Sequence, residues 1–109
     1  FQNQKYYYNH EIIMEQTIGS EYAKRNKRDV WNVKVASYPE AHCATFPMEL
    51  ITPCIKAGSP EGGLVLDPFM GSGTVAQAAK QLSRKYTGCE LNPDYYKIIN
   101  NRLKQQELF

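Results

Sequence analysis

The chain has 109 residues, of which 42% are hydrophobic and 22% are charged, and its formal net charge is +2. This length allows one small domain at most, and this apolar content excludes an intrinsically disordered chain. The sequence has no apolar run of about 18 residues and no secretory signal, so we expect neither a membrane span nor export. The widely spaced cysteines, without a Cys-x-x-Cys pair, favour reduced thiols in a cytoplasmic protein over disulfides or a metal site.

The N-terminal residues form the first of two expected regions. Residues 11–18 carry β-branched side chains without helix caps, which predicts a strand. Residues 21–28 are charged and predict a loop, and residues 29–35 predict a short extended segment. We therefore divide the chain into an N-terminal strand with a basic loop, residues 1–28, and a second region, residues 29–109.

The second region opens with a helix over residues 46–57. Its apolar positions recur at helical spacing, Thr45 can cap its start, and Gly58 follows its end. Pro53 costs about 3 kcal/mol inside an ideal helix. We therefore expect either a kink at this proline or an effective helix start nearer Leu50.

A strand, a glycine-rich turn, a helix, a second strand and a last helix follow. Residues 63–66 are a continuous apolar run, as expected of a parallel strand covered on both faces. Residues 67–74 form the turn, residues 75–82 are alanine-rich and predict a helix, and residues 85–89 predict a strand. Residues 93–104 predict the last helix, which should bury Tyr96, Ile99 and Leu103. This order predicts an α/β fold with an incomplete doubly wound sheet.

The glycine-rich turn reads DPFMGSGT, and its glycines allow a ligand to lie against bare backbone. Thr74 stands where the P-loop requires a lysine, which excludes that motif. Residues 71–76 satisfy the dinucleotide pattern glycine-x-glycine-x-x-alanine, with Glu90 at about 20 residues beyond. A dinucleotide would, however, bring its anionic pyrophosphate close to the carboxylate of Asp67. The ammonium and sulfonium groups of S-adenosylmethionine suit that carboxylate, so we favour S-adenosylmethionine as the cofactor.

Glu90 ends the second expected strand, in step with the glycine turn after the first. An acidic side chain at this position can accept hydrogen bonds from both ribose hydroxyls of an adenosine ligand. The competing interpretation is an exposed glutamate before a turn, and the position favours the ribose role. Leu91 either covers the adenine ring or belongs to the core.

Four segments carry a family resemblance: residues 25–31 (RNKRDVW), 41–47 (AHCATFP), 67–74 (DPFMGSGT) and 88–96 (GCELNPDYY). The last two resemble the S-adenosylmethionine region of bacterial and phage DNA amino-methyltransferases, which modify the exocyclic amine of adenine (N6) or cytosine (N4). The segment AHCATFP is similar to the cofactor-side motif that precedes the glycine loop in the permuted "beta" order of that family. The segment RNKRDVW resembles the approach to it, and the whole resemblance covers residues 25–103.

The resemblance implies a partial Rossmann-like methyltransferase fold, with residues 29–109 as an S-adenosylmethionine-binding β-α-β region and its preceding helix. It also implies that Asp67 binds the methionine ammonium and that Glu90 binds the ribose. Phe46 would shield the methyl group, and its alternative role is an apolar staple of the following helix. The residues expected to contact the cofactor are Thr45, Phe46, Asp67, Pro68, Phe69, Gly71, Gly73, Thr74, Glu90 and Leu91.

Enzymes of this family use a (Asp/Asn/Ser)-Pro-Pro-(Tyr/Phe) tetrapeptide for their chemistry, and this sequence contains none. We therefore assign no catalytic residue. The spacing of the cysteines also gives no reason to assign a metal ligand. Residues 92–95 (NPDY) imitate the tetrapeptide, but Asn92 as N-cap and Pro93 as first helical residue make an ordinary helix start. In the family's order the tetrapeptide would lie before Phe1. We expect a missing N-terminal part or a second chain to supply it, and this chain alone to be inactive.

The basic cluster consists of Lys24, Arg25, Lys27 and Arg28. Its members are candidates for contacts with DNA phosphates, and an ordinary solvated loop is the equal alternative. The resemblance implies double-stranded DNA as the partner, with the target base flipped out of the helix.

The function implied by the resemblance is methyl transfer within a bacterial or phage restriction–modification system. We favour adenine N6 over cytosine N4 as the target. The alternatives are an inactive fragment or regulatory subunit that keeps the fold and, less favoured, a fragment of a dinucleotide-binding oxidoreductase. Assembly into a homo-oligomer stays open at this level.

Overall fold

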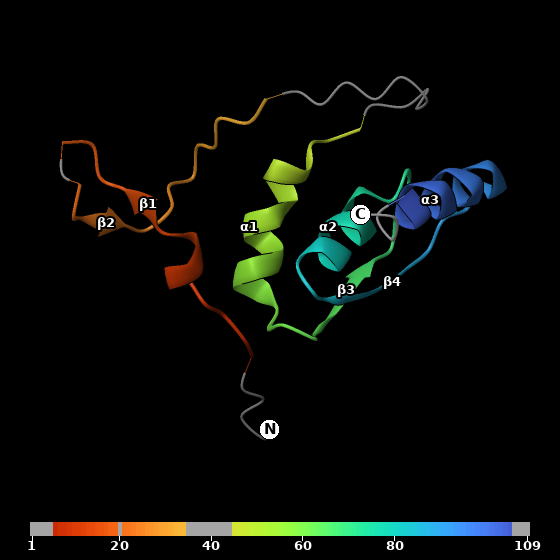
Figure 1. Cartoon of the computed structure of the whole chain (residues 1–109), viewed down its shortest axis with the longest axis horizontal. Coiled ribbons are helices and arrows are strands. Elements are labelled where there is room, and N and C mark those ends of the chain that lie inside the picture. The colour runs from red at the N-terminus through yellow and green to blue at the C-terminus, as the bar shows by residue number, and fades with distance from the viewer. Residues whose placement is uncertain (1–5, 20, 35–44, 106–109) are drawn as a thin grey trace.

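The structure, a computed structural model, describes residues 6–19, 21–34 and 45–105. Its elements in chain order are the 3-10 helix η1 (Glu11–Ile13), strands β1 (Glu15–Gln16) and β2 (Lys24–Arg25), helix α1 (Met48–Gly58), strand β3 (Leu64–Asp67), helix α2 (Thr74–Gln81), strand β4 (Lys85–Gly88) and helix α3 (Pro93–Gln105). Helix α1 stands between an N-terminal hairpin and an α/β unit (Figure 1). No helix in these three stretches is both long enough and apolar enough to cross a membrane.

Strands β3 and β4 form a parallel pair, which places their carboxyl ends side by side. The register aligns Leu64 with Lys85 at one end and Asp67 with Gly88 at the other. Parallel strands require a crossover connection, and helix α2 provides it while packing on both strands. This arrangement confirms the expected α/β class and the β-α-β unit, and its two-stranded sheet makes the Rossmann-like fold a partial one.

Helix α2 packs between α1 and α3 because its inward side chains are small. The first core cluster contains Ile55, Ala78 and Ala79. The second contains Ala76, Ile99 and Leu103. Alanine side chains let neighbouring helices approach closely while filling the interior at high density. Helix α2 therefore joins both clusters, and the expected burial of Ile99 and Leu103 is confirmed.

Tyr96 was expected in this core and lies outside it, with 49% of its surface exposed. Its hydroxyl donates a hydrogen bond to the backbone carbonyl of Glu90 at 3.0 Å. The ring spans from α3 to the end of β4, because a phenol needs a polar partner for its hydroxyl.

One face of the β3–β4 sheet is bare. Leu64 and Leu66 are 64% and 66% exposed, whereas Val65 packs against the first core cluster. Successive side chains of a strand point to opposite faces, so both leucines lie on the same uncovered face. The expectation that this strand is covered on both faces is therefore wrong within the described part of the chain. Parallel sheets are normally covered on both faces, which makes this face a surface for further elements.

The N-terminal hairpin differs from the expected strand at residues 11–18. The segment begins with the 3-10 helix η1 and reaches only a short strand, β1, which pairs antiparallel with β2. Strand β2 falls in a segment that was expected to be a loop. Glu15 lies opposite Arg25 in this register, and the attraction of opposite charges across the strands favours the pairing. A hydrogen bond from the Asn9 N–H to the carbonyl of Ala57, at 2.9 Å, joins the segment before η1 to α1.

Helix α1 begins at Met48, between the two expected starts at residue 46 and near Leu50, and it continues through Pro53. Pro47 precedes the first helical residue and no side chain caps the helix, so the capping role of Thr45 is wrong. Pro53 lies inside the helix, and the hydroxyl of Thr52 donates to the Met48 carbonyl at 2.9 Å just before it. Gly58 is the last helical residue, close to the expected end. The expectations for residues 35–44 fall outside the described residues.

Replacing Gly88 by alanine is expected to destabilise the fold by about 1–3 kcal/mol. A Cβ atom at Gly88 would lie 2.5 Å from the carbonyl oxygen of Asp67 and would overlap the side chain of Met70. Urea unfolding followed by circular dichroism measures the change. Gly58→Ala is the matched control, because nothing lies within 4 Å of a Cβ atom there. Equal stability of the two variants would contradict the close approach of β4 to the turn after β3.

Candidate ligand-binding site

The candidate site lies where β3 and β4 end. Cys89 N–H donates to the carbonyl of Asp67 at 3.0 Å, and Met70 N–H donates to the carbonyl of Cys89 at 2.9 Å, so pairing continues beyond the strands. The half-buried carboxylate of Asp67 accepts a hydrogen bond from the Phe69 N–H at 3.0 Å. An aspartate that binds the backbone two residues ahead stabilises a turn. The chain therefore turns at a defined place with an acidic group at its base.

The glycine loop, residues 69–74, follows this turn. Gly71 and Gly73 have φ angles of +51° and +82°, a region that glycine enters at little cost. Gly73 precedes the first residue of α2, and its N–H donates to the carbonyl of Met70 at 2.8 Å. A Cβ atom at Gly73 would lie 3.1 Å from the side chain of Ile99 on α3. Both the backbone angle and the contact with α3 thus require glycine at this position.

Glu90 fastens the glycine loop to the end of β4. One carboxylate oxygen accepts from the Gly71 N–H at 2.7 Å and the other from the Asn92 N–H at 2.8 Å. The hydrogen bond from the Asn92 N–H is the largest cause that lowers the pKa of Glu90 below its usual value. Burial opposes it, and the hydrogen bond from the Gly71 N–H adds to the lowering. Each carboxylate oxygen has a second lone pair, so capacity for hydroxyl donors remains. The structure places Glu90 beside the loop as expected, and its ribose role stays a prediction.

A cavity of about 250 Å³ opens beside the glycine loop. It is lined by Thr45, Phe46, Phe69, Met70, Gly71, Ser72, Thr74 and Tyr95. Thr45 and Phe46 precede α1, so the structure brings the predicted upstream segment onto the loop. Phe46 is 43% exposed and Phe69 is 88% exposed, which leaves two aromatic rings available to a ligand. The cavity therefore unites half of the expected binding residues around one opening.

The remaining expected residues lie around this cavity without lining it. Asp67 lines a separate groove of about 370 Å³ between α1 and β3. Pro68 is exposed in the turn, and Gly73 faces α3. Leu91 is 99% exposed, so its interpretation as a core residue is wrong. An exposed leucine beside Glu90 is free to cover an aromatic ligand, and that role stays a prediction.

The expected helix start after Glu90 is confirmed. The side-chain oxygen of Asn92 accepts a hydrogen bond from the Asp94 N–H at 3.0 Å, as an N-cap residue does. Pro93 is the first residue of α3. The tetrapeptide at residues 92–95 therefore starts a helix, as expected.

Arg102 is a residue of this site that the sequence reasoning missed. Its guanidinium donates to the carbonyl of Ser72 at 2.8 Å and to the hydroxyl of Thr74 at 3.3 Å. The available signal was its spacing, because a residue three positions after the buried Ile99 borders the same helix face. Arginine on an otherwise apolar helix face indicates a specific acceptor across the interface.

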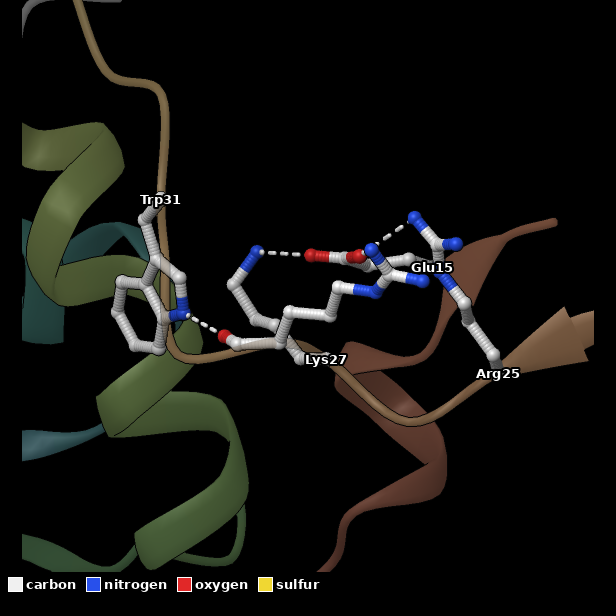
Figure 2. Close-up of polar contacts among 5 residues, drawn as sticks. Glu15, Arg25, Lys27 and Trp31 are labelled. Carbon is white, nitrogen blue, oxygen red and sulfur yellow. Dashed lines mark hydrogen bonds and ion pairs between the residues drawn. The ribbon is translucent and has the colours of Figure 1, made fainter. Parts of the chain in front are cut away.

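The basic cluster surrounds a carboxylate in the N-terminal hairpin. Figure 2 shows Glu15 between Arg25 and Lys27, at N–O distances of 3.6 Å and 3.2 Å. The hydrogen bond from Lys27 is the main cause that lowers the pKa of Glu15 below its usual value. The Lys27 ammonium also lies 4.9 Å from the centre of the Trp31 ring, within cation–π range. The positive charges of two of the four candidate DNA-binding residues, Arg25 and Lys27, are therefore paired with the carboxylate of Glu15.

The other two candidates present their charges to solvent. Lys24 and Arg28 are both exposed, and Arg28 lines a cavity of about 500 Å³ together with Trp31. Cations that are exposed are better placed to meet a phosphate than those already paired. Contact of this cluster with DNA stays a prediction.

Comparisons with known proteins identify DNA methyltransferases as similar proteins. The profile of a DNA methylase family matches residues 1–101. The type II methyltransferase M.Cfr9I of Citrobacter freundii is 48% identical over 105 residues, which are 96% of this chain and 34% of that protein. The type II methyltransferase M.SmaI of Serratia marcescens is 42% identical over 91% of this chain and 34% of its own length. The chain thus spans about a third of the curated relatives it matches.

Two solved structures share the fold. The M1.HpyAVI-SAM complex is 25% identical, covers 91% of this chain and 44% of its own, and superposes with a TM-score of 0.66. The PvuII DNA methyltransferase, described as cytosine-N4-specific, is 35% identical over 58% of this chain and 22% of its own, with a TM-score of 0.55.

Acidification should release the glycine loop from Glu90. The lowered pKa means that the ionised carboxylate stabilises the folded loop above pH 4.5, and this stabilisation is lost as pH falls through the folded-state pKa. The Gly71 amide resonance in NMR spectra should stay constant from neutral pH to about 5 and shift with a midpoint below 4.5. Glu90→Gln should remove this titration, whereas Glu49→Gln, an exposed change on α1, should preserve it. A titration that survives in Glu90→Gln would contradict the anchoring role.

Proposed function

The chain belongs to the DNA methylase family, and we propose that it forms the S-adenosylmethionine-binding part of an enzyme that methylates an exocyclic amine of a DNA base. One observation carries this proposal: the carboxylate of Asp67 stands at the end of β3, at the base of a glycine loop that Glu90 holds from the next strand. The neighbour described as a SAM complex, which aligns with most of the chain, supports the choice of cofactor.

The charge of the site favours this cofactor over a dinucleotide. S-adenosylmethionine carries an ammonium and a sulfonium group, and a carboxylate stabilises both. A pyrophosphate at the start of α2 would instead meet Asp67 and Glu90. Its attraction to the helix N-terminus, typically 0.3–1 kcal/mol, would have to offset that repulsion. A dinucleotide oxidoreductase is therefore the weaker reading of the same loop.

Six of the expected residues are assigned a role in this proposal. Asp67 holds the ammonium end of the cofactor, and the bare backbone at Gly71 lies along it. Phe46 and Phe69 form the apolar walls beside the loop, and exclude water from the methyl group. Glu90 accepts the ribose hydroxyls through its second lone pairs, and the exposed side chain of Leu91 covers the adenine ring.

In this mechanism the chain binds and orients the methyl donor. The target base would leave the DNA stack, at a cost of a few kcal/mol, and enter a pocket beside the cofactor site. S-adenosylmethionine held by Asp67 and Glu90 would supply the methyl group, and positioning would supply much of the acceleration. The groups that polarise the base amine come from the tetrapeptide outside this chain.

The unpaired edge of β3 and the exposed face of the β3–β4 sheet support the proposal that further strands complete this sheet. Strand β3 pairs with β4 on one edge, and within the described residues its other edge has no strand partner. The groove between α1 and β3, lined by apolar residues such as Ile51 and Val65, runs along that edge. The side chains of Leu64 and Leu66 lie exposed on the adjoining face of the sheet. A further strand with its own helices would bury these side chains, and it would come from the rest of a longer protein, from a second subunit or from another copy.

A cytosine target becomes a second candidate beside adenine. The PvuII neighbour is described as cytosine-N4-specific, and its matched region includes more than half of this chain. The base-recognising pocket lies outside the chain, so both amines fit the cofactor site equally well. The matched relatives are type II methyltransferases, and we place the protein in the same restriction–modification context, acting on cytoplasmic DNA.

The wild-type chain is expected to bind S-adenosylmethionine in a calorimetric titration, and Asp67→Asn should weaken binding by about tenfold or more. The substitution keeps the acceptor for the Phe69 N–H but removes the charge that holds the ammonium, a loss of about 1.5–3 kcal/mol. Asp94→Asn is the matched control, because that side chain is 82% exposed on α3. Unchanged affinity in Asp67→Asn, or tight binding of NAD in place of S-adenosylmethionine, would overturn the proposed cofactor site.

A chimera tests whether the chain supports catalysis or is an inactive copy of the fold. The 105 matched residues of M.Cfr9I are replaced by those of this chain, which are 48% identical. The chimera should transfer labelled methyl groups from S-adenosylmethionine to DNA, and mass spectrometry of the nucleosides identifies N6-methyladenine or N4-methylcytosine. Asp67→Ala in the chimera should abolish transfer. A stably folded chimera that binds the cofactor without transferring methyl would instead support a regulatory or degenerate role.

A further inference from the structure

Helix α3 presents one arginine to the glycine loop. Ile99 and Leu103 bury α3 against α2, and Arg102 lies between them in the sequence, half-buried at the border of the same face. The packing of the helix pair therefore brings its guanidinium to the start of α2. No motif in the sequence had marked this position.

The guanidinium spans the loop and the first turns of α2. One terminal nitrogen, Nη1, donates to the Ser72 carbonyl at 2.8 Å, to the Ser72 hydroxyl at 2.9 Å and to the Thr74 hydroxyl at 3.3 Å. The other, Nη2, donates to the side-chain carbonyl of Gln77 at 2.6 Å. A planar fork of donors can meet several acceptors at fixed angles, and a lysine ammonium cannot reproduce that geometry.

Stabilising helix α2 does not explain a cation at this position. The N-terminus of a helix carries a partial positive charge, so a neighbouring cation disfavours the helix. Arg102 lies close to that end, at Thr74 and Ser72. What its contacts secure is the path of the loop, because they hold both the backbone and the side chain of Ser72.

The loop needs such support because glycine leaves its backbone free. Gly71 and Gly73 both adopt positive φ angles, and in an unrestrained chain many other conformations compete with this one. Glu90 anchors the loop on the side of β4 through Gly71, and Arg102 anchors it on the side of α3 through Ser72. A loop that is ordered before its ligand arrives loses less entropy on binding.

We propose that Arg102 is a positioning residue of the cofactor site, which holds the glycine loop in its binding conformation and thereby raises the affinity for S-adenosylmethionine. The effect on affinity rests on the proposed function, whereas the effect on the loop does not. Arg102 itself acts through Ser72 and Thr74, without touching the cofactor.

The test compares Arg102→Met and Arg102→Lys with two control variants. Arg84→Met removes another buried arginine, which donates to the carbonyls of Ser59 and Leu82 away from the loop. Lys97→Met changes a side chain on α3 that is 83% exposed. Thermal unfolding of each variant defines a temperature at which all are folded, and the remaining measurements are made there.

Hydrogen exchange of residues 70–74 gives the readout that is independent of the cofactor. Arg102→Met should speed exchange in this loop by about tenfold or more, as expected from losing a hydrogen bond to a charged donor. Arg102→Lys should fall between Arg102→Met and the wild type. Neither control should change exchange in the loop. Loop exchange in Arg102→Met equal to that in Lys97→Met would overturn the positioning role.

Calorimetric titration with S-adenosylmethionine gives the second readout. Arg102→Met should weaken binding by about tenfold, and Arg84→Met should not, even if it lowers the unfolding temperature more. An equal loss of affinity in both variants would mean that Arg102 contributes only to the general stability of the fold, and it would overturn the proposal. A wild-type chain that does not bind S-adenosylmethionine would refute the proposed function alone, because the exchange experiment still decides the role of Arg102 in the loop.

If Arg102→Met does not fold, Ser72→Ala with Thr74→Val removes the acceptor hydroxyls instead and leaves the arginine in place. This double variant should speed loop exchange in the same direction as Arg102→Met. Loop exchange is its readout, because Ser72 and Thr74 line the cavity and their loss would change the affinity directly. Loop exchange at the wild-type rate would overturn the inference.

Discussion

The hydrogen bonds from the backbone of Gly71 and Asn92 to the carboxylate of Glu90 join the loop after β3 to the end of β4 and to the start of α3. Through Gly71 the carboxylate holds the loop after β3, and through Asn92 it holds the turn that starts α3. Both strands of a parallel pair end at the same edge, so this one side chain can reach both connections. A carboxylate is well suited to this role, because it accepts several N–H donors and is ionised at neutral pH, with a pKa lowered by those same donors.

Helix α2 explains why the loop stands where a ligand can reach it. Its alanines let α1 pack on one side and α3 on the other, in two separate core clusters. Helix α1 brings Phe46 to the loop, while α3 brings Ile99 and Arg102. Helix α2 therefore packs against both helices that bring residues to the site, and the position of the loop depends on the small side chains of α2.

The same architecture leaves the domain incomplete in a specific way. The glycine loop is anchored from two directions, whereas within the described residues the outer edge and one face of β3 stay uncovered. Under the proposed function, the chain would hold the methyl donor and further strands would supply the catalytic groups. The matched relatives are about three times as long as the region that they share with this chain.

The sequence by itself determined the features that depend on neighbouring residues. These include the order of strand, glycine loop and helix, the N-cap at Asn92, and the family, because local hydrogen bonding and φ angles depend on the residues at hand. The tertiary structure decided the contacts between residues far apart along the chain. It placed Arg102 against Ser72, paired Glu15 with Arg25, and left Leu91 and Tyr96 outside the core. Periodicity shows which face of a helix is buried, but only the packing of helices and strands decides which polar groups meet across that face.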